Sequence, residues 1–253
     1  MALNLENTTA VITGASSGIG AATARRLVGL GARVALLARR RERLTELERE
    51  LNDSHPGSAR AYAIDVTEEQ SVVDVMGAIA DEFGHVDILV NAAGVGTWAP
   101  AMESRLSDWR AMVNVNIDGV LTSTHAALPY LTRAANGERG IADIVCVSSI
   151  AGRRVPGPNS NVYAATKHAV HAFSEALRRE LAEQHVRVGL VAPGIVTTEM
   201  TTTGEKYAPD ARNPSGLGFL DAEDIADAIG YMLTRPRHAS ISEIAIRPTE
   251  QVS

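Results

Sequence analysis

The sequence predicts an α/β protein built on a Rossmann-type topology, that is, a doubly wound parallel sheet of about seven strands with helices on both faces. Two observations support this class. Short apolar runs rich in β-branched residues recur along the chain, and longer segments of helical periodicity separate them. Near-continuous hydrophobic strands are typical of a parallel sheet that is buried on both faces. The strands are expected at residues 9–13, 33–38, 61–64, 86–90, 143–148, 187–192 and 243–247.

The segments between the strands carry helix signals. Leu44, Leu47 and Leu51 stand at positions i, i+3 and i+7, which makes the apolar stripe of an amphipathic helix. Further along, Thr67 occupies the N-cap position of a helix with acidic residues in its first turn. Right-handed crossovers through such helices give the doubly wound order. With no internal repeat and no linker, residues 1–253 are expected to form a single domain.

The least regular stretch is 198–220, which is rich in threonine, glycine and proline. It is too long for an ordinary connection between elements, so it suggests a substrate lid over a site. A disordered surface loop would have the same composition, and both interpretations stay open.

Composition narrows the class of function. Hydrophobic residues make up 45% and charged residues 21%, the balance of a globular protein with a full core. The net charge of −6 and the pI near 5.7 argue against a general nucleic-acid or anionic-membrane binder. The single cysteine, Cys146, excludes an intramolecular disulfide, and the histidines lack metal-ligand spacing, so no metal site is expected. The absence of a signal peptide and of a long apolar run favours a cytoplasmic enzyme with no membrane partner.

A glycine-rich turn follows the first strand. Gly14, Gly18 and Gly20 allow a tight turn and a close approach of the backbone to a pyrophosphate, and the helix that begins near Gly18 directs its free N–H groups at the same place. The spacing is G-x-x-x-G-x-G and does not match the G-x-G-x-x-G fingerprint literally. Between a first strand and a helix, the turn nevertheless favours a dinucleotide site.

The end of the second strand indicates which dinucleotide. An acidic residue there would accept hydrogen bonds from a ribose 2′-hydroxyl, but the chain has Ala38 followed by three arginines. A carboxylate would repel a 2′-phosphate, whereas Arg39 can bind it bidentately, with Arg40 as a further candidate contact. The expected cofactor is therefore NADPH/NADP. Arg41 is expected only to begin the next helix.

Six motifs occur in an order that resembles one family. They are "TGASSGIG" (13–20), "NAAG" (91–94), "NVNIDG" (114–119), "VSSIAG" (147–152), "YAATK" (163–167) and "PGIVTTEM" (193–200). Together they resemble the short-chain dehydrogenase/reductase family over essentially the whole chain. The resemblance implies a single-domain Rossmann-like oxidoreductase. The closing "HASISEIAIRPTEQ" further resembles an NADP-dependent subgroup that includes clavulanic acid dehydrogenase and hydroxy-acid or serine dehydrogenases.

By that resemblance, four residues match the family's catalytic tetrad: Asn116, Ser149, Tyr163 and Lys167. Tyr163 would be the general acid and base, and the Lys167 ammonium one helical turn away would favour its phenolate form. Ser149, at the carboxyl end of a strand, would hydrogen-bond the substrate oxygen, while Asn116 would hold a water of a proton relay. The open alternatives are a solvated helix face for the Tyr/Lys pair and a plain interhelix hydrogen bond for Asn116.

The same motifs imply coenzyme contacts. Asp65 would accept from the adenine amino group, although a helix N-terminal acid near Thr67 is the alternative. Asn91 would contribute, but part of its role would be to tie neighbouring strands together. The full set of expected contacts is Gly14, Ser16, Ser17, Gly18, Ile19, Gly20, Arg39, Arg40, Asp65, Val66, Asn91, Ala92, Gly94, Tyr163, Lys167, Pro193, Gly194 and Thr198.

The expected function is hydride transfer between NADPH and a small-molecule carbonyl or alcohol substrate. An NADP-sensing regulatory protein without turnover is the alternative. Arg153 and Arg154 suggest a carboxylate-bearing substrate, though a surface loop would look the same. The apolar helices 107–133 and 160–184 would form the family's subunit interfaces, so a homotetramer is expected, with a dimer as the alternative.

Overall fold

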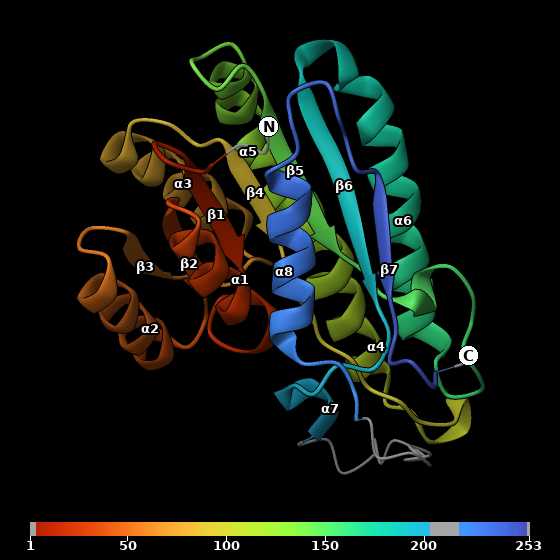
Figure 1. Cartoon of the computed structure of the whole chain (residues 1–253). Coiled ribbons are helices and arrows are strands. Elements are labelled where there is room, and N and C mark those ends of the chain that lie inside the picture. The colour runs from red at the N-terminus through yellow and green to blue at the C-terminus, as the bar shows by residue number, and fades with distance from the viewer. Residues whose placement is uncertain (1–3, 203–217, 252–253) are drawn as a thin grey trace.

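The computed structural model describes residues 4–202 and 218–251. Its centre is a parallel sheet in the order β3-β2-β1-β4-β5-β6-β7, the predicted doubly wound arrangement (Figure 1). The strand order reverses between β1 and β4, and such switch points open a crevice at the carboxyl ends of the strands. The strand bounds are β1 Thr9–Thr13, β2 Arg33–Ala38, β3 Ala59–Ala63, β4 Ile88–Asn91, β5 Ala142–Val147, β6 Val186–Pro193 and β7 Glu243–Ile246.

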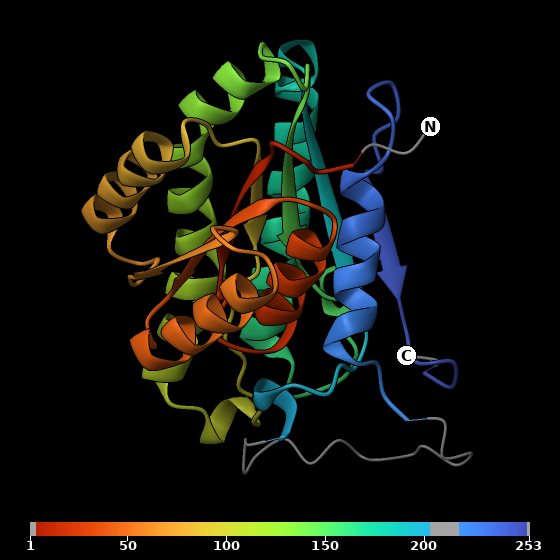
Figure 2. The same ribbon diagram turned by 60° about the vertical axis from the view of Figure 1, so that its left-hand side comes forward.

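Helices cover both faces of the sheet, as Figures 1 and 2 show. One apolar core joins the sheet to α1, α2 and α8, and a second core joins its other face to α3, α5 and α6. Strands buried on both sides explain the near-continuous hydrophobic runs. These helices are α1 Gly18–Gly29, α2 Arg41–Ser54, α3 Glu69–Phe83, α5 Gly119–Ala135, α6 Asn161–Glu180 and α8 Ala222–Leu233.

The connection that precedes α5 is unusual. Helix α4 (Leu106–Val113) passes into a π-helical turn, Asn114–Asp118, and then directly into α5. π-Turns are rare and recur at functional sites, because the widened turn redirects a side chain. Here the redirected residue is Asn116, which is 1% exposed. The remaining short helices are the 3₁₀ turns Ala101–Glu103, Ile150–Gly152 and Ala182–Gln184, and α7 Glu199–Thr202.

All seven expected strands are present, with ends shifted by at most two residues. The N-cap prediction for Thr67 is wrong, because α3 begins at Glu69 with Glu68 as its N-cap. Thr67 instead donates its amide and hydroxyl to the Asp65 carboxylate, at 3.0 and 2.9 Å. Arg41 is the first residue of α2, as expected.

The expected lid at 198–220 is described only at its two ends. It begins with α7, and Leu220 forms an isolated parallel bridge with Val196. Residues 203–217 lie outside the described part of the chain. Among the helices that are described, none has the length and apolar character needed to cross a membrane.

Candidate active site

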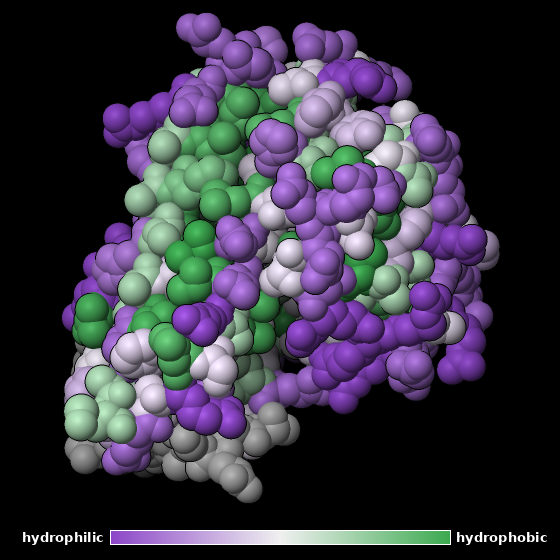
Figure 3. Space-filling view, turned by 180° about the vertical axis from the view of Figure 1, so that it is seen from behind, coloured by the Kyte–Doolittle hydropathy of each residue, from purple (hydrophilic) through white to green (hydrophobic). Residues whose placement is uncertain are grey.

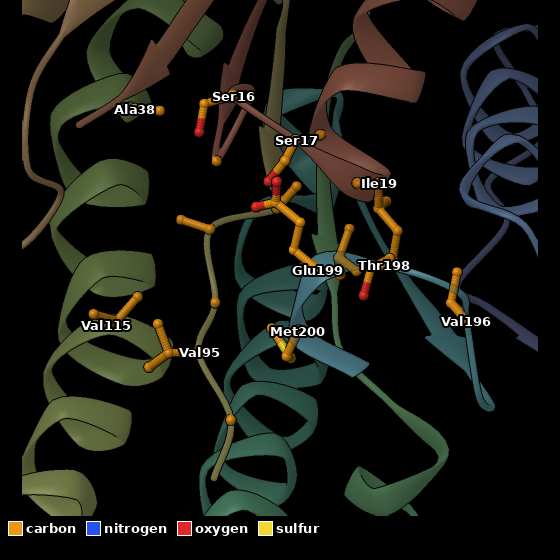
Figure 4. A pocket seen from close by; sticks show the side chains of 18 of the residues that line it. Ser16, Ser17, Ile19, Ala38, Val95, Val115, Val196, Thr198, Glu199 and Met200 are labelled. Carbon is orange, nitrogen blue, oxygen red and sulfur yellow. The ribbon is translucent and has the colours of Figure 1, made fainter. Parts of the chain in front are cut away.

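A cavity of about 500 Å³ lies at the carboxyl ends of the central strands. Figure 4 shows side chains from the glycine turn, the end of β2, the loop after β4 and α7 gathered around it. Every expected coenzyme contact except Asn91 lines this cavity, as do three of the four expected catalytic residues. The fold therefore brings together residues that are far apart in the sequence.

The glycine turn fits a dinucleotide phosphate for steric reasons. Gly14 and Gly18 have φ angles of +69° and +51°, the left-handed region that favours glycine. A Cβ at Gly14 would lie 2.7 Å from the Ala93 backbone, and one at Gly20 would lie 2.4 Å from the Gly14 carbonyl oxygen. Glycine at these positions lets the turn pack against itself and against the loop after β4, at the N-terminus of α1, whose free N–H groups attract an anion. Coenzyme contact itself stays a prediction.

Ser149, Tyr163 and Lys167 form the opposite wall. Ser149 is the second residue after β5, and its hydroxyl accepts from the Ala151 amide at 3.1 Å and approaches the Pro193 carbonyl oxygen at 3.5 Å. Tyr163 lies in the first turn of α6, with its ring centroid 5.1 Å from that of Trp98. The Lys167 Nζ atom is 5.7 Å from the Tyr163 ring centroid. The Tyr/Lys pair therefore faces the cavity instead of forming a solvated helix face.

Lys167 carries an unusual charge for so buried a place. It is 6% exposed, and its ammonium donates to the Val147 carbonyl at 3.1 Å. Burial lowers the pKa of Lys167 to about 8, because removal from water disfavours the charged form. At neutral pH the side chain still carries its proton, yet it loses the proton far more readily than an exposed lysine. It can therefore take part in proton movement near neutrality.

Asn116 stands behind the cavity wall and does not line it. Its Oδ1 atom accepts from the Val95 amide at 2.8 Å, and its Nδ2 atom donates to the Val95 carbonyl at 2.9 Å and to Thr166 Oγ1 at 3.1 Å. The bond to Thr166 joins the π-turn to α6. The interhelix hydrogen bond that the sequence left open is thus present, and the water-holding role stays a prediction.

Asn91 differs from its expected place on the coenzyme side. It is 2% exposed, and its Nδ2 atom donates to Thr124 Oγ1 at 3.0 Å and to the Cys146 Sγ atom at 3.7 Å. The side chain thus ties β4 to α5 and β5, and it does not reach the cavity. Of its two expected roles, only the structural one is seen. Cys146 itself is buried, which raises the pKa of its thiol.

Arg39 is the predicted main phosphate contact after β2, but in the structure Arg40 is held more firmly at the cavity. Arg39 lines the cavity, but its side chain is 67% exposed and lies 3.7 Å from Asp65. Arg40 is the better anchored cation, because it donates to Ser16 Oγ at 3.0 and 3.1 Å and to Ser17 Oγ at 2.6 Å. Asp65 lies in the turn before α3, where its Oδ1 atom accepts from Thr67, and it also lines the cavity.

Two residues at this end of the cavity were missed by sequence reasoning. Glu199, from α7, accepts a hydrogen bond from Arg40 at 2.7 Å and also pairs with Arg43. The spacing of Arg40 and Arg43 at i and i+3 could have placed two cations on one side of a helix start. No local pattern could have found Glu199, because it lies more than 150 residues further along the chain.

A second, shallower hollow of about 390 Å³ borders the catalytic wall. Its lining consists of Arg153, Arg154, Arg247 and Gln251. The first two follow the 3₁₀ turn after Ser149, and the Gln251 side chain accepts from the Ile195 amide at 3.0 Å. Arg153 is partly neutralised by Glu243 at 3.2 Å. Among the described residues, no cluster of His, Cys, Asp or Glu could hold a metal ion.

The pKa of Lys167 predicts a change in the pH dependence of stability. Its value is near 8 in the folded chain and close to that of a free lysine, 10.5, in the unfolded chain. Between these values the unfolded chain binds more protons, so the free energy of unfolding contributed by this residue rises with pH. Below pH 8 the buried charge costs about 3 kcal/mol. We expect Lys167→Met to be more stable than the parent protein at pH 7.

The measurement is urea-induced unfolding of both proteins between about pH 7 and pH 10. The gain from Lys167→Met should shrink steadily across this window, because the parent protein becomes neutral at Lys167 as pH rises. Lys167→Arg keeps the charge and should show no such gain. Parallel profiles for the parent and Lys167→Met would contradict the buried-charge account.

Comparison with known proteins agrees with the architecture and the motifs. A family model described as short chain dehydrogenase matches residues 8–208. An uncharacterized oxidoreductase of Staphylococcus epidermidis is 38% identical, over 94% of this chain and 96% of its own length. Such identity over nearly full length extends beyond the motifs to the whole domain.

Solved structures give the same result. A closed form of serine dehydrogenase complexed with NADP⁺ has a TM-score of 0.86 and 31% identity, covering 97% of each chain. A 3-ketoacyl-(acyl-carrier-protein) reductase from Brucella melitensis, complexed with NADH, has a TM-score of 0.84 and 32% identity, covering 96% of this chain and 98% of that one. The chain belongs to the short-chain dehydrogenase family, and it is an oxidoreductase of that family.

Proposed function

We propose that this oxidoreductase uses NADP(H) to interconvert a small-molecule carbonyl compound and the corresponding alcohol, with Tyr163 as general acid and base. The observation that carries the proposal is the meeting of Ser149, Tyr163 and Lys167 on one wall of a cavity whose other wall is the glycine turn. A bound nicotinamide would supply or accept the hydride. The glycine turn, the N-terminus of α1 and the arginines after β2 would hold the coenzyme's phosphates.

The protein's part of the reaction is the movement of a proton. In carbonyl reduction, the Tyr163 hydroxyl would donate its proton to the substrate oxygen, and the Ser149 hydroxyl would hydrogen-bond the same atom. The neighbouring Lys167 ammonium would stabilise the phenolate that remains. In alcohol oxidation the phenolate would take the proton back.

Proton resupply would follow the path from Lys167 to Asn116. A Cβ at Gly94 would be in ordinary van der Waals contact with Asn116 Oδ1 at 3.4 Å and Lys167 Nζ at 3.7 Å, so glycine leaves open the space beside these two groups. Asn116 Oδ1 accepts one bond from Val95 and keeps a second lone pair that could accept from a water in this space. The open space and the spare lone pair both support the proposed water relay.

The second hollow supports a substrate class. Arg247 follows the last residue of β7, which pairs with Pro193 of the cavity wall, and Arg153 and Arg154 follow the turn after Ser149. Guanidinium groups so close to the catalytic wall favour a carbonyl substrate with a carboxylate or another anionic group. The serine named for one solved relative also carries a carboxylate.

Subunit association would follow from apolar residues left on the helical face behind the sheet. Leu106, Val113 and Leu121 of α4 and α5 are 56%, 42% and 39% exposed. Figure 3 shows hydrophobic residues gathered in a band on this side of the molecule. We propose that this face joins subunits in a homotetramer, or in a dimer.

The first test measures NADPH absorbance with aldehydes, ketones and β-keto acids. We expect NADPH loss with at least one class of carbonyl compound. Tight NADPH binding with no turnover on any of them would instead favour a sensor without catalysis.

Tyr163→Phe should bind NADPH as the parent protein does, yet turn over at least about 10²-fold more slowly, because the ring stays and only the acidic hydroxyl is lost. Tyr231→Phe, at a 49% exposed tyrosine of α8, is the matched control and should be unchanged. Near-normal turnover by Tyr163→Phe would remove the general-acid assignment.

Arg247→Met should raise KM for aldehyde acids about tenfold and leave KM for uncharged aldehydes unchanged, because it removes an anion contact and no catalytic group. Arg105→Met serves as the control, since Arg105 is exposed, pairs with Asp108 and does not line the hollow. Equal changes for charged and uncharged substrates would contradict the anion subsite.

Leu121→Glu should convert the oligomer to smaller species in sedimentation velocity, because a carboxylate would be buried at the interface. Val73→Glu replaces an equally exposed residue on α3 and should leave the mass unchanged. If the parent protein sediments as a monomer, the interface proposal is wrong.

A further inference from the structure

Glu199 of α7 reaches across the cavity to the arginines after β2. Its two carboxylate oxygens accept from Arg40 and from Arg43, which lie at the start of α2. In Figure 4 the Glu199 carboxylate points at Ser17 of the glycine turn. Because Arg40 also donates to Ser16 and Ser17, one polar cluster joins three segments of the chain.

This cluster occupies the place where the fold receives the adenosine ribose. In a doubly wound sheet, the residues just after the second strand meet the ribose 2′-position. The cluster offers two guanidinium groups and two hydroxyl groups from that place, a donor set suited to a phosphate. Glu199 supplies the anion that satisfies these donors in the present arrangement.

A 2′-phosphate and the Glu199 carboxylate cannot both keep these partners. Hydrogen bonds from Arg40 and then from Arg43 lower the pKa of Glu199 to about 2, so its carboxylate is charged across the neutral range. A phosphate monoester carries a charge of about −1.5 to −2 at pH 7, and like charges side by side repel. One anion must therefore leave the arginines when the other binds.

Glu199 belongs to the segment 196–202, here called the strap, which also lies against the glycine turn. A Cβ at Gly18 would lie 3.2 Å from Thr198 Cγ2, and Thr201 Oγ1 accepts from the Thr198 amide at 3.0 Å. The segment 196–202 thus crosses from the end of β6 to the phosphate side of the cavity. Residues of this segment line the cavity, so a movement of Glu199 away from the arginines would also move part of the cavity wall.

We propose that Glu199 competes with the 2′-phosphate of NADP(H) for Arg40 and Arg43. Binding of the 2′-phosphate and release of α7 from α2 are then linked, and Glu199 lowers the preference for NADPH over NADH. The inference rests on the proposed use of NADP(H). It goes beyond that use by assigning a coenzyme-specificity role to an acidic residue of the strap.

The test uses two nucleotides that isolate the 2′-phosphate from any hydride transfer. Adenosine 2′,5′-bisphosphate carries this phosphate, and 5′-AMP lacks it. Calorimetric titration of each into the full chain gives the ratio of their dissociation constants. We expect Glu199→Gln to bind the bisphosphate about tenfold more tightly than the parent protein, with the affinity for 5′-AMP unchanged. The amide keeps the size of the carboxylate and removes its charge.

Glu50→Gln is the matched control, because Glu50 also pairs with an arginine, Arg25, at a comparably exposed place on α2. It should leave both affinities unchanged. Hydrogen exchange adds a second readout, since amides of residues 198–202 should exchange faster when the bisphosphate binds and not when 5′-AMP binds.

The outcomes separate this inference from the proposed coenzyme. If the parent protein prefers the bisphosphate and Glu199→Gln has equal or weaker affinity for it, the competition is refuted and NADP(H) use stands. If neither protein prefers the bisphosphate over 5′-AMP, both the competition and NADP(H) use fail. A preference that appears only in Glu199→Gln would support the competition in its strongest form.

Discussion

The amide group of Asn116 holds together the parts on which the catalytic wall depends. Its three hydrogen bonds connect a π-turn, the loop after β4 and α6. Thr166, which receives one of them, donates in turn to the Tyr163 carbonyl oxygen at 2.8 Å. A regular α-helical turn at 114–118 would aim the amide elsewhere. The helix that carries Tyr163 is thus tied by hydrogen bonds to a local irregularity in another helix.

Much of the fold could be predicted because its signals are local. A strand buried on both faces must be apolar along its whole length, so runs such as β6 are visible without knowledge of their neighbours. Helix α8 was not among the expected helices, although Asp221 and Asp224 form a capping box before it. The irregular stretch 198–220 ends just before α8, so in the sequence the capping box at Asp221 reads as part of the loop. Acidic residues after Thr67 favour it as the N-cap, but its amide and hydroxyl donate to Asp65 and the helix begins two residues later, at Glu69.

In the candidate site, too, the residues predicted correctly are those with local signals, and the others depend on distant contacts. Tyr163 and Lys167 share a helix, so their spacing alone brings them to one face. The side chain of Asn91 turns inward because Thr124 and Cys146 offer partners that lie 33 and 55 residues away. Glu199 finds its arginines across more than 150 residues. Contacts of this kind are set by tertiary packing, and no periodicity or spacing in one segment encodes them.

The buried lysine and the buried thiol have a consequence for chemical resistance. The whole chain contains only two lysines, Lys167 and Lys206, and one cysteine, against a large excess of arginine. Aldehydes add covalently to amines and thiolates, whereas a guanidinium group is protonated and a poor nucleophile at neutral pH. Lys167 is 6% exposed and Cys146 is 1% exposed. Outside the cavity, the described residues therefore present an electrophile with no exposed thiol or ammonium side chain, whereas a compound that enters the cavity meets Lys167.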